Sequence, residues 1–157
     1  MKHLNSVPVV ILLMIASVSV SQQCYSQQSI YAELLGNGIA LSVNYDYVYS
    51  NGLGWRAGVG LATFDRENGA SIPVTFHYVL GATHQVEFGL GMVYSGMDSD
   101  VYPISSIAYR YRSDVPGVLF RLAANPLRLL AESLPPLDIP AGKGVGLPIS
   151  FSLGYAF

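Results

Sequence analysis

The chain is poor in charged residues, and this excludes several classes of protein. Asp, Glu, Lys and Arg make up 11% of its 157 residues, compared with roughly 25% in an ordinary soluble domain. The 8 basic residues are outnumbered by 10 acidic ones, so the formal net charge is −2. A nucleic-acid partner is not expected, because that kind of binding depends on Lys and Arg that neutralise phosphates. Hydrophobic residues make up 51% of the chain, which excludes an intrinsically disordered tail.

Cysteine and histidine are also scarce. The single cysteine, Cys24, cannot form an internal disulfide framework or a multi-thiolate metal site. Beyond the N-terminal segment the only histidines are His77 and His84, which have no partner at metal-ligand spacing, and no HExxH motif occurs. Asp98 and Asp100 could meet a divalent cation, but two carboxylates make a poor site, and a solvated loop is the better interpretation. The sequence therefore predicts no bound metal and no cofactor.

No hydrophobic run is long enough for a membrane-spanning helix. The longest, Val7–Val20, is shorter than the roughly 20 residues that such a helix needs. Lys2 precedes this run and small polar residues follow it, which is the layout of a secretory signal peptide. We predict cleavage after Ser21, so that residues 1–21 are the signal peptide and residues 22–28 are a short N-terminal extension of the exported chain.

Two alternatives concern the end of this signal peptide. A second small-x-small site ends at Ser26, and cleavage there would remove Cys24. Lipid attachment to Cys24 would need a small residue before the cysteine, but Gln23 stands in that position. The Ser- and Gln-rich segment Ser21–Ser29 is typical of a processed boundary, which disfavours a buried core helix at the N-terminus.

After residue 28, apolar residues recur at every second position, which is the pattern of a half-buried β-strand. The pattern is clearest at the C-terminus, where the large apolar positions are Leu147, Ile149, Phe151, Leu153, Tyr155 and Phe157. Similar segments predict eight antiparallel strands over Ile30–Gly36, Ile39–Tyr49, Leu53–Phe64, Ser71–Leu80, Gln85–Ser95, Val101–Ser113, Val118–Asn125 and Leu147–Phe157.

Eight such strands are compatible with two architectures: a soluble lipocalin-like barrel with its apolar face inside, or a membrane barrel with that face against lipid. The opposite face decides between them, since it carries residues such as Gly58, Gly89 and Ser152. Small residues suit a narrow lumen but cannot cover a soluble surface, of which roughly 25–35% is charged. Closure also pairs every strand edge, as lipid requires. We therefore predict that residues 29–157 form an all-β, eight-stranded, antiparallel, transmembrane up-and-down β-barrel.

In barrels of this kind the termini lie in the periplasm, where the turns are short, and the outer loops are longer. The predicted periplasmic turns are Ser50–Gly52, Gly81–His84 and Asp114–Gly117. The predicted outer loops are Gly36–Gly38, Asp65–Ala70, Gly96–Asp100 and Pro126–Gly146. Asn51-Gly52 is a typical hairpin turn, whereas the connection at Gly36–Gly38 is unusually tight for an outer loop. Within the last, proline-rich loop, Leu127–Leu134 could form a short helix.

The inward face of this predicted barrel carries both signs of charge. The residues concerned are Asp46, Arg56, His77, Glu87, Arg110, Arg112 and Arg121. Glu33 is a further candidate, although its strand alternates poorly. An isolated charge in so narrow a lumen costs several kcal/mol, so we expect these groups to pair and to fill the lumen. An eight-stranded interior holds only side chains or one small ligand, which leaves a narrow channel or a small-ligand site as the alternative.

A lipid-modifying enzyme is a second alternative. Some eight-stranded outer-membrane barrels acylate or deacylate lipid A with a Ser/His pair, and a deacylase of that type carries the pair on its lipid-facing wall. Here His77 is assigned to the lumen and His84 to a turn, and no His-x-Ser sequence occurs. Gly58-Val59-Gly60 does not stand at a strand-to-helix junction, so it is no phosphate-binding loop. We therefore expect no enzymatic activity.

The last eight residues, Ser150–Phe157, resemble the β-signal that the outer-membrane assembly machinery reads. That signal has a terminal aromatic residue and alternating apolar positions before it, which correspond here to Leu153, Tyr155 and Phe157. The resemblance implies that the assembly machinery and its periplasmic chaperones are partners of this chain.

More broadly, Tyr31–Tyr47, Gly52–Gly60 and Ser150–Phe157 resemble small outer-membrane barrel proteins of Bacteroidota-type Gram-negative bacteria, with an eight-stranded barrel like that of OmpA or OmpX. The resemblance implies a place in the bacterial outer membrane, in contact with its lipids, and it brings no catalytic residues. We expect a monomeric barrel with a structural or surface-interaction role, in which the outer loops are the contact sites.

Overall fold

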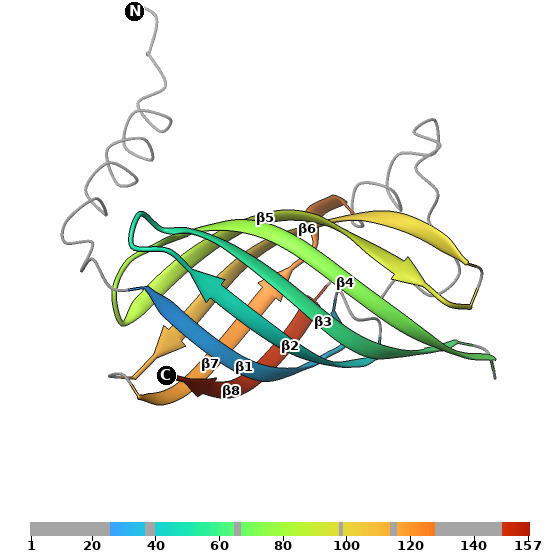
Figure 1. Ribbon diagram of the computed structural model, residues 1–157, viewed down its shortest axis with the longest axis horizontal. Helices are drawn as coiled ribbons and strands as arrows, with labels where there is room; N and C mark the ends of the chain where they lie inside the picture. The colour runs from blue at the N-terminus through green and yellow to red at the C-terminus, as the bar shows by residue number, and fades with distance from the viewer. Residues whose placement is uncertain (1–25, 37–39, 65–66, 98, 114–115, 128–148) are drawn as a thin grey trace, which may run out of the picture.

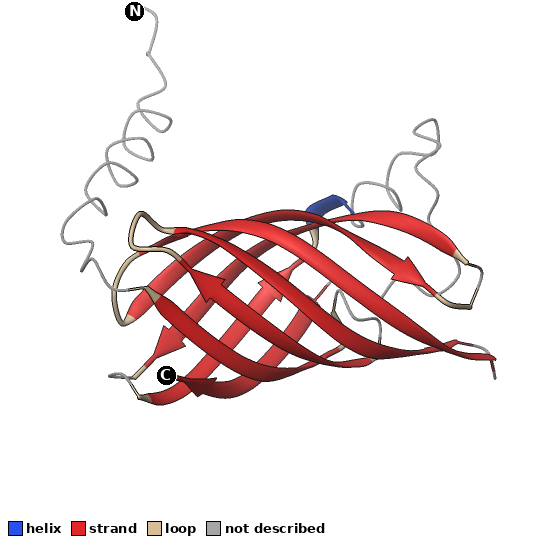
Figure 2. Cartoon of the chain, viewed as in Figure 1, coloured by secondary structure: helices blue, strands red, loops and turns tan. Residues whose placement is uncertain are grey.

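A computed structural model describes residues 26–36, 40–64, 67–97, 99–113, 116–127 and 149–157. Its strands are β1 (Gln27–Leu34), β2 (Leu41–Val48), β3 (Leu53–Phe64), β4 (Glu67–Leu80), β5 (His84–Ser95), β6 (Asp100–Arg112), β7 (Gly117–Ala124) and β8 (Ile149–Ala156). Each strand pairs with its neighbours in chain order, and β1 pairs with β8, so the sheet closes into a barrel (Figures 1 and 2). The predicted all-β, eight-stranded, antiparallel up-and-down barrel is confirmed. No helix in the described part of the chain is long and apolar enough to cross a membrane.

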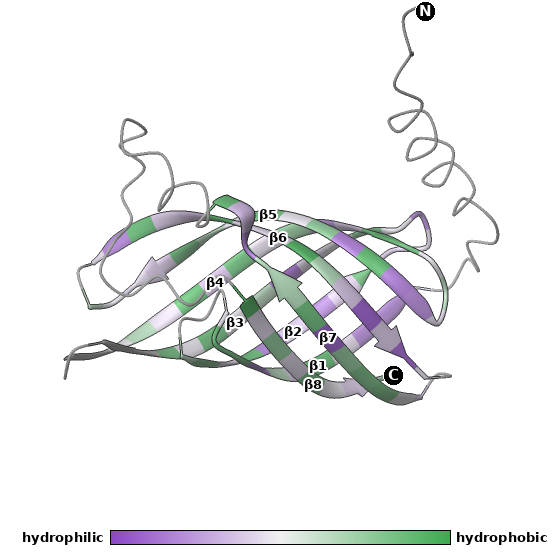
Figure 3. Ribbon diagram, turned by 180° about the vertical axis from the view of Figure 1, so that it is seen from behind, coloured by the Kyte–Doolittle hydropathy of each residue, from purple (hydrophilic) through white to green (hydrophobic). Residues whose placement is uncertain are grey.

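Successive side chains of each strand point alternately to the outer wall and to the lumen, as strand geometry requires. On β2, for example, Val43 is 53% exposed and Asn44 only 1%. The outward positions are mostly large and apolar, whereas the inward positions are mostly small or polar. In Figure 3 this difference appears as hydrophobic and hydrophilic bands that alternate along the strands. The lumen therefore has the polar face that the sequence pattern assigned to it.

The two ends of the barrel carry different connections. One end, called here the turn end, has the short connections β2–β3, β4–β5 and β6–β7, together with the start of β1 and the end of β8. The opposite end, called the loop end, has the connections β1–β2, β3–β4, β5–β6 and β7–β8. Of these, β1–β2 and β7–β8 are longer than the turn-end connections, β5–β6 is of similar length, and β3–β4, residues 65–66, is the shortest. Figure 1 shows the end of β8 beside the start of β1.

The β2–β3 turn has the Asn-Gly geometry that its sequence predicts. The backbone N–H of Tyr49 donates to the carbonyl of Leu53 at 2.7 Å, and the N–H of Gly52 donates to the carbonyl of Tyr49 at 2.9 Å. The side-chain oxygen of Asn51 accepts a hydrogen bond from the N–H of Leu53 at 3.1 Å. Gly52 has a φ of 85°, a left-handed conformation that glycine adopts without steric cost.

The prediction of a loop over Asp65–Ala70 was wrong, because most of that segment is strand. β4 begins at Glu67, and the pairs Phe64↔Glu67 and Thr63↔Asn68 extend the β3–β4 hairpin. The polar residues after Arg66 have no apolar alternation, yet backbone pairing needs none. The predicted short helix Leu127–Leu134 lies outside the described residues, apart from its first residue.

β1 also differs from its prediction at both ends. It begins at Gln27, within the segment predicted as an N-terminal extension, and Gln27 pairs with Val48. It ends at Leu34, because Leu35 takes a left-handed φ of 59°. Leu34 and Leu35 are both 48% exposed, and this break in the alternation explains why the first strand was hard to recognise in the sequence.

The edge of β6 near the loop end extends beyond β7. The last β6–β7 pair is Ile107↔Ala124, and the following residues of the chain satisfy part of the free edge. The backbone N–H and hydroxyl of Ser105 both donate to the side-chain oxygen of Asn125, at 3.4 and 3.2 Å. Pro103, two residues nearer the loop end of β6 than Ser105, has no N–H to leave unpaired, which suits a strand edge.

Candidate functional site

The strongest concentration of chemistry in the described chain is a buried cluster of charges across the lumen. Its members come from six different strands, and each is at most 2% exposed. They are called here the ionic cluster and comprise Glu33, Asp46, Arg56, Glu87, Arg110 and Arg121. Five of them belong to the seven lumen residues predicted from the sequence, and Glu33 is the further candidate named there.

Glu87 lies at the centre of this cluster and contacts all three arginines. Its Oε2 is 2.7 Å from Nη2 of Arg56 and 3.1 Å from Nη1 of Arg110. Its Oε1 is 2.8 Å from Nη2 of Arg121 and accepts a hydrogen bond from the hydroxyl of Ser106 at 3.3 Å. One carboxylate thus joins β3, β6 and β7 to its own strand, β5.

The other two carboxylates complete the cluster. Asp46 is 2.8 Å from Nη2 of Arg110 through Oδ2 and 3.2 Å from Nη2 of Arg56 through Oδ1. Glu33 Oε2 is 3.4 Å from Nη1 of Arg121. Three guanidinium groups therefore face three carboxylates, and their formal charges cancel. This balance matters because each ion moved out of water loses several kcal/mol of solvation, which only close and well-bonded partners offset.

Glycines on neighbouring strands make room for the large inward side chains. A Cβ at Gly54 would clash with the ring of His77, and one at Gly58 would clash with the amide of Asn44. A Cβ at Gly154 would likewise meet Tyr31. The large inward side chains thus pack against small residues on the neighbouring strands. The guanidinium carbon of Arg56 lies over the ring of Tyr31, 5.3 Å from its centre. At this distance a cation and an aromatic ring attract each other.

His77 and Arg112, the remaining two predicted lumen residues, do not join the cluster in the same way. Nε2 of His77 lies 3.4 Å from Oδ1 of Asp46, so it touches the cluster without a hydrogen bond to it. Arg112 also points inward, close to the turn end, and is 6% exposed. Among the described residues it forms no ion pair.

Several buried polar atoms beside the cluster have no hydrogen-bond partner in the described chain. They include the hydroxyls of Tyr31 and Thr75, both ring nitrogens of His77 and Nη1 of Arg56. Thr75 pairs directly with Arg56 across β3 and β4. Polar groups of this kind are where buried water binds in other proteins, so this part of the lumen is polar in character.

The other residues singled out in the sequence lie apart from the lumen. His84 begins β5 at the turn end, is exposed, and lies with Nδ1 2.7 Å from the hydroxyl of Tyr109. Asp100 begins β6, and Asp98 lies outside the described residues. The described residues contain no group of three or more His, Cys, Asp or Glu side chains that could hold a metal ion.

The residues of the predicted assembly signal lie on the outer wall at and beyond β8. Leu153 is 55% exposed, Tyr155 51% and Phe157 47%. The N–H of Phe157 donates to the carbonyl of Gln28 at 2.9 Å, which continues the pairing with β1 by one residue.

Sequence reasoning missed three partners of the ionic cluster. Tyr31 lies over Arg56, the hydroxyl of Ser29 donates to Asp46 at 3.4 Å, and Ser106 donates to Glu87. The neutral side chains carried no signal of their own. Two of the three belong to β1, whose alternation ends at Leu34.

Comparison of the chain with protein-family models, with curated proteins and with solved structures finds no match.

Proposed function

We propose that this protein is an outer-membrane β-barrel with a structural or surface-interaction role, and that the ionic cluster closes its lumen. In this proposal the chain is exported by its N-terminal signal peptide and inserted as a monomer by the outer-membrane assembly machinery. Its wall contacts the lipids of the membrane. The turn end faces the periplasm, and the loop end faces the cell exterior.

The observation that carries the proposal is the composition of the outer wall. Among the described side chains, no Asp, Glu, Lys or Arg projects from it, whereas all four described arginines point inward. Its most exposed side chains are large and apolar: Phe76 is 70% exposed, Leu90 67% and Val59 66%. Soluble monomers rarely expose apolar patches larger than a few hundred Å². A continuous uncharged belt around a closed barrel instead suits a hydrocarbon environment.

The geometry of the lumen supports a closed barrel better than a pore. The side chains of Arg56, Arg110 and Arg121 meet around Glu87 across the lumen, in the path that water or ions would take. Passage would require these ion pairs to separate inside a narrow lumen, where an unpaired charge costs several kcal/mol. A narrow channel therefore remains only the second candidate.

Gel mobility of the outer-membrane fraction tests the membrane placement. A closed barrel resists SDS at low temperature and migrates differently from its boiled, unfolded form. We expect the protein in the outer-membrane fraction with such a mobility shift. A periplasmic, soluble protein without a shift would contradict the proposal.

Cysteine labelling of intact cells tests the orientation. Ser99→Cys lies in the β5–β6 connection at the loop end, and Ser50→Cys lies in the β2–β3 turn. Both side chains are exposed and both changes are conservative. A membrane-impermeant maleimide should label Ser99→Cys on intact cells and Ser50→Cys only after the outer membrane is opened, with the unchanged chain as the background for Cys24. The reverse pattern would contradict the assigned orientation.

A further inference from the structure

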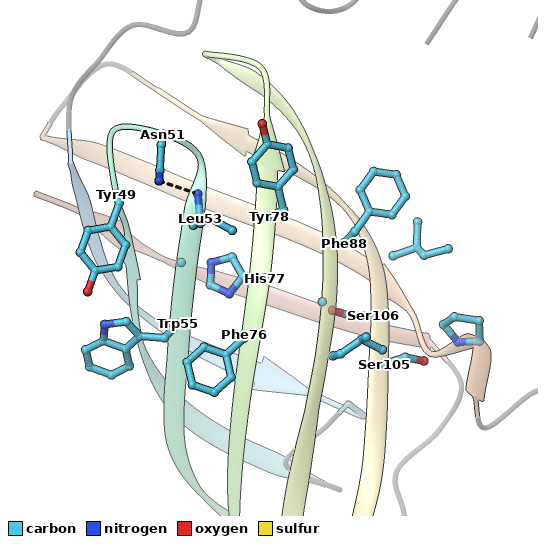
Figure 4. Close-up of a pocket in the computed structure, with 15 residues that line it drawn as sticks. Tyr49, Asn51, Leu53, Trp55, Phe76, His77, Tyr78, Phe88, Ser105 and Ser106 are labelled. Atoms are coloured by element: carbon cyan, nitrogen blue, oxygen red, sulfur yellow. Dashed lines mark hydrogen bonds between the residues drawn. The ribbon is translucent and has the colours of Figure 1, made fainter. Parts of the chain in front are cut away.

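A groove of about 830 Å³ crosses the outer wall over β3, β4, β5 and β6. Two rows of side chains paired across these strands form its sides. The row nearer the turn end is Leu53, Tyr78, Phe88 and Ile107. The second row is Trp55, Phe76, Leu90 and Ser105. Figure 4 labels Leu53, Tyr78 and Phe88 of the first row and Trp55, Phe76 and Ser105 of the second.

The floor of the groove is backbone. Between the two outward rows runs an inward row in the same register, and it consists of Gly54, His77, Gly89 and Ser106. Gly54 and Gly89 have no side chain, and the side chains of His77 and Ser106 are buried on the lumen side, so only peptide groups lie between the two outward rows. Large side chains on both sides of a bare floor produce a long, narrow trough.

The dimensions of this trough limit what can occupy it. Its two sides are two residues apart along each strand, which corresponds to about 7 Å. An α-helix with its side chains is about 10–12 Å across, too wide to enter. Four adjacent strands give a length of about 14 Å, close to half of the roughly 30 Å hydrocarbon core of a bilayer. One extended, unbranched chain is the occupant that fits.

The two ends of the groove differ in their position along the barrel wall and in polarity. Leu53 is the first residue of β3 at the turn end, and Tyr49 and Asn51 of the preceding turn also line the groove. At the other end lies Ile107, near the middle of β6, where Pro126 covers the wall. The groove therefore runs from a polar rim into the middle of the apolar belt, as an acyl chain runs from its headgroup into a bilayer.

Charge indicates which lipid suits the rim. Tyr49 and Asn51 supply neutral polar groups there, and no Lys or Arg side chain of the described residues faces outward. An anionic headgroup would have no cation to pair with, whereas a zwitterionic one needs none.

We propose that this groove binds one acyl chain of a zwitterionic phospholipid from the leaflet at the turn end, with its headgroup beside Tyr49 and Asn51. This inference rests on the membrane placement proposed above and names one lipid-binding site on the outer wall. A lipid held there stays with the barrel longer than its freely exchanging neighbours.

Trp55 is the only tryptophan of the chain, and it forms part of the groove wall. The full exported barrel is reconstituted into phosphatidylcholine vesicles that contain increasing fractions of phosphatidylcholine brominated in its acyl chains, which quenches tryptophan. A bound lipid predicts quenching that rises steeply at low mole fraction, several-fold above proportionality, and then saturates. Leu90→Ala should abolish most of this excess because it removes part of one ridge. Leu122→Ala on β7 is the matched control and should retain it, since Leu122 is outward-facing and lies away from the groove.

Each result has a distinct meaning, provided that both variants retain the SDS-dependent mobility shift of a folded barrel. Quenching in simple proportion to the brominated fraction for all three proteins would overturn the lipid site and leave the membrane placement intact. If the unchanged protein itself shows no mobility shift and its Trp55 is not quenched at any fraction, the membrane placement is overturned. Trp55 shielded in a concentration-dependent dimer would assign the groove to a second copy of the chain and overturn the lipid site.

Discussion

The lumen and the outer wall of this barrel consist of alternate residues of the same strands, yet their chemistry is opposite. On β5, Glu87 is fully buried among three arginines, whereas its neighbours Val86 and Phe88 point outward and are 38% and 48% exposed. On β3, Arg56 points inward between Trp55 and Ala57. A shift of one residue in register would exchange the two faces of a strand, so the register of each strand is strongly specified.

The comparison also shows where stability comes from. The buried apolar cluster in the described lumen is small and comprises Val93, Tyr102 and Ile104. Polar contacts hold the rest of the interior, and the apolar side chains that would form the core of a soluble domain face outward instead. We therefore expect changes of charge to matter on both faces but in opposite senses: removing a charge should harm the lumen, and adding one should harm the outer wall.

The largest expected effect is the loss of the central carboxylate. Glu87→Gln keeps the shape of the side chain but leaves three arginines around a neutral amide, and breaking a buried ion pair in this way costs about 3–5 kcal/mol. The free energy of unfolding in urea, measured in lipid vesicles, should fall by that amount. Adding Arg56→Met to the same chain restores equal numbers of both charges, keeps the Arg110–Asp46 and Arg121–Glu33 pairs, and should recover part of the loss. An unchanged unfolding free energy in the single variant would show that the cluster does not stabilise the barrel.

The converse change places a charge on the outer wall. Val59→Arg in the middle of β3 exchanges a 66% exposed apolar side chain for a cation. In the proposed membrane placement this cation meets hydrocarbon, which costs about 2–4 kcal/mol near the midplane of a membrane. The same urea titration measures it, with Val59→Leu as a control that should cost little. If Val59→Arg behaves like Val59→Leu, this face does not meet lipid.

Removal of Phe157 separates assembly from stability. The residue follows β8 and is 47% exposed, so its loss should cost the folded barrel less than about 1 kcal/mol. The predicted assembly signal nevertheless requires its terminal aromatic ring. Pulse–chase experiments with protease should therefore show slow insertion and accumulation of degradable chain in the periplasm, with Phe157→Tyr as the control. Insertion of the truncated chain at the normal rate would refute the signal.

The smallest effect is expected at the one described arginine outside the ionic cluster. Arg112→Gln removes an inward, 6% exposed cation that pairs with no described carboxylate, so the free energy of unfolding should not fall. Arg121→Gln, measured in parallel, breaks two ion pairs and should be far more harmful. Equal losses in the two variants would mean that burial of an arginine, and not its pairing, determines its contribution.

Much of the fold could be predicted from the alternation of residue types. The bounds of β3 were predicted to the residue, and those of β5, β6 and β7 to within one residue at each end. The errors occur where pairing depends on backbone alone, as in the polar start of β4, or where one residue leaves the strand conformation, as at Leu35. In those segments apolar and polar residues do not alternate, so the sequence does not indicate a strand.

The sequence by itself determined which residues face inward, because strand geometry converts a period of two into two faces. Only the tertiary structure decided which inward charges meet. Arg110 reaches Asp46 across 64 positions of the chain, and Arg121 reaches Glu33 across 88, while Arg112, two residues from Arg110, forms no such pair with the described chain. Position within a strand sets a direction, but the height and angle of a side chain in the lumen depend on the closure and stagger of all eight strands. The charge pairing is therefore a property of the closed barrel.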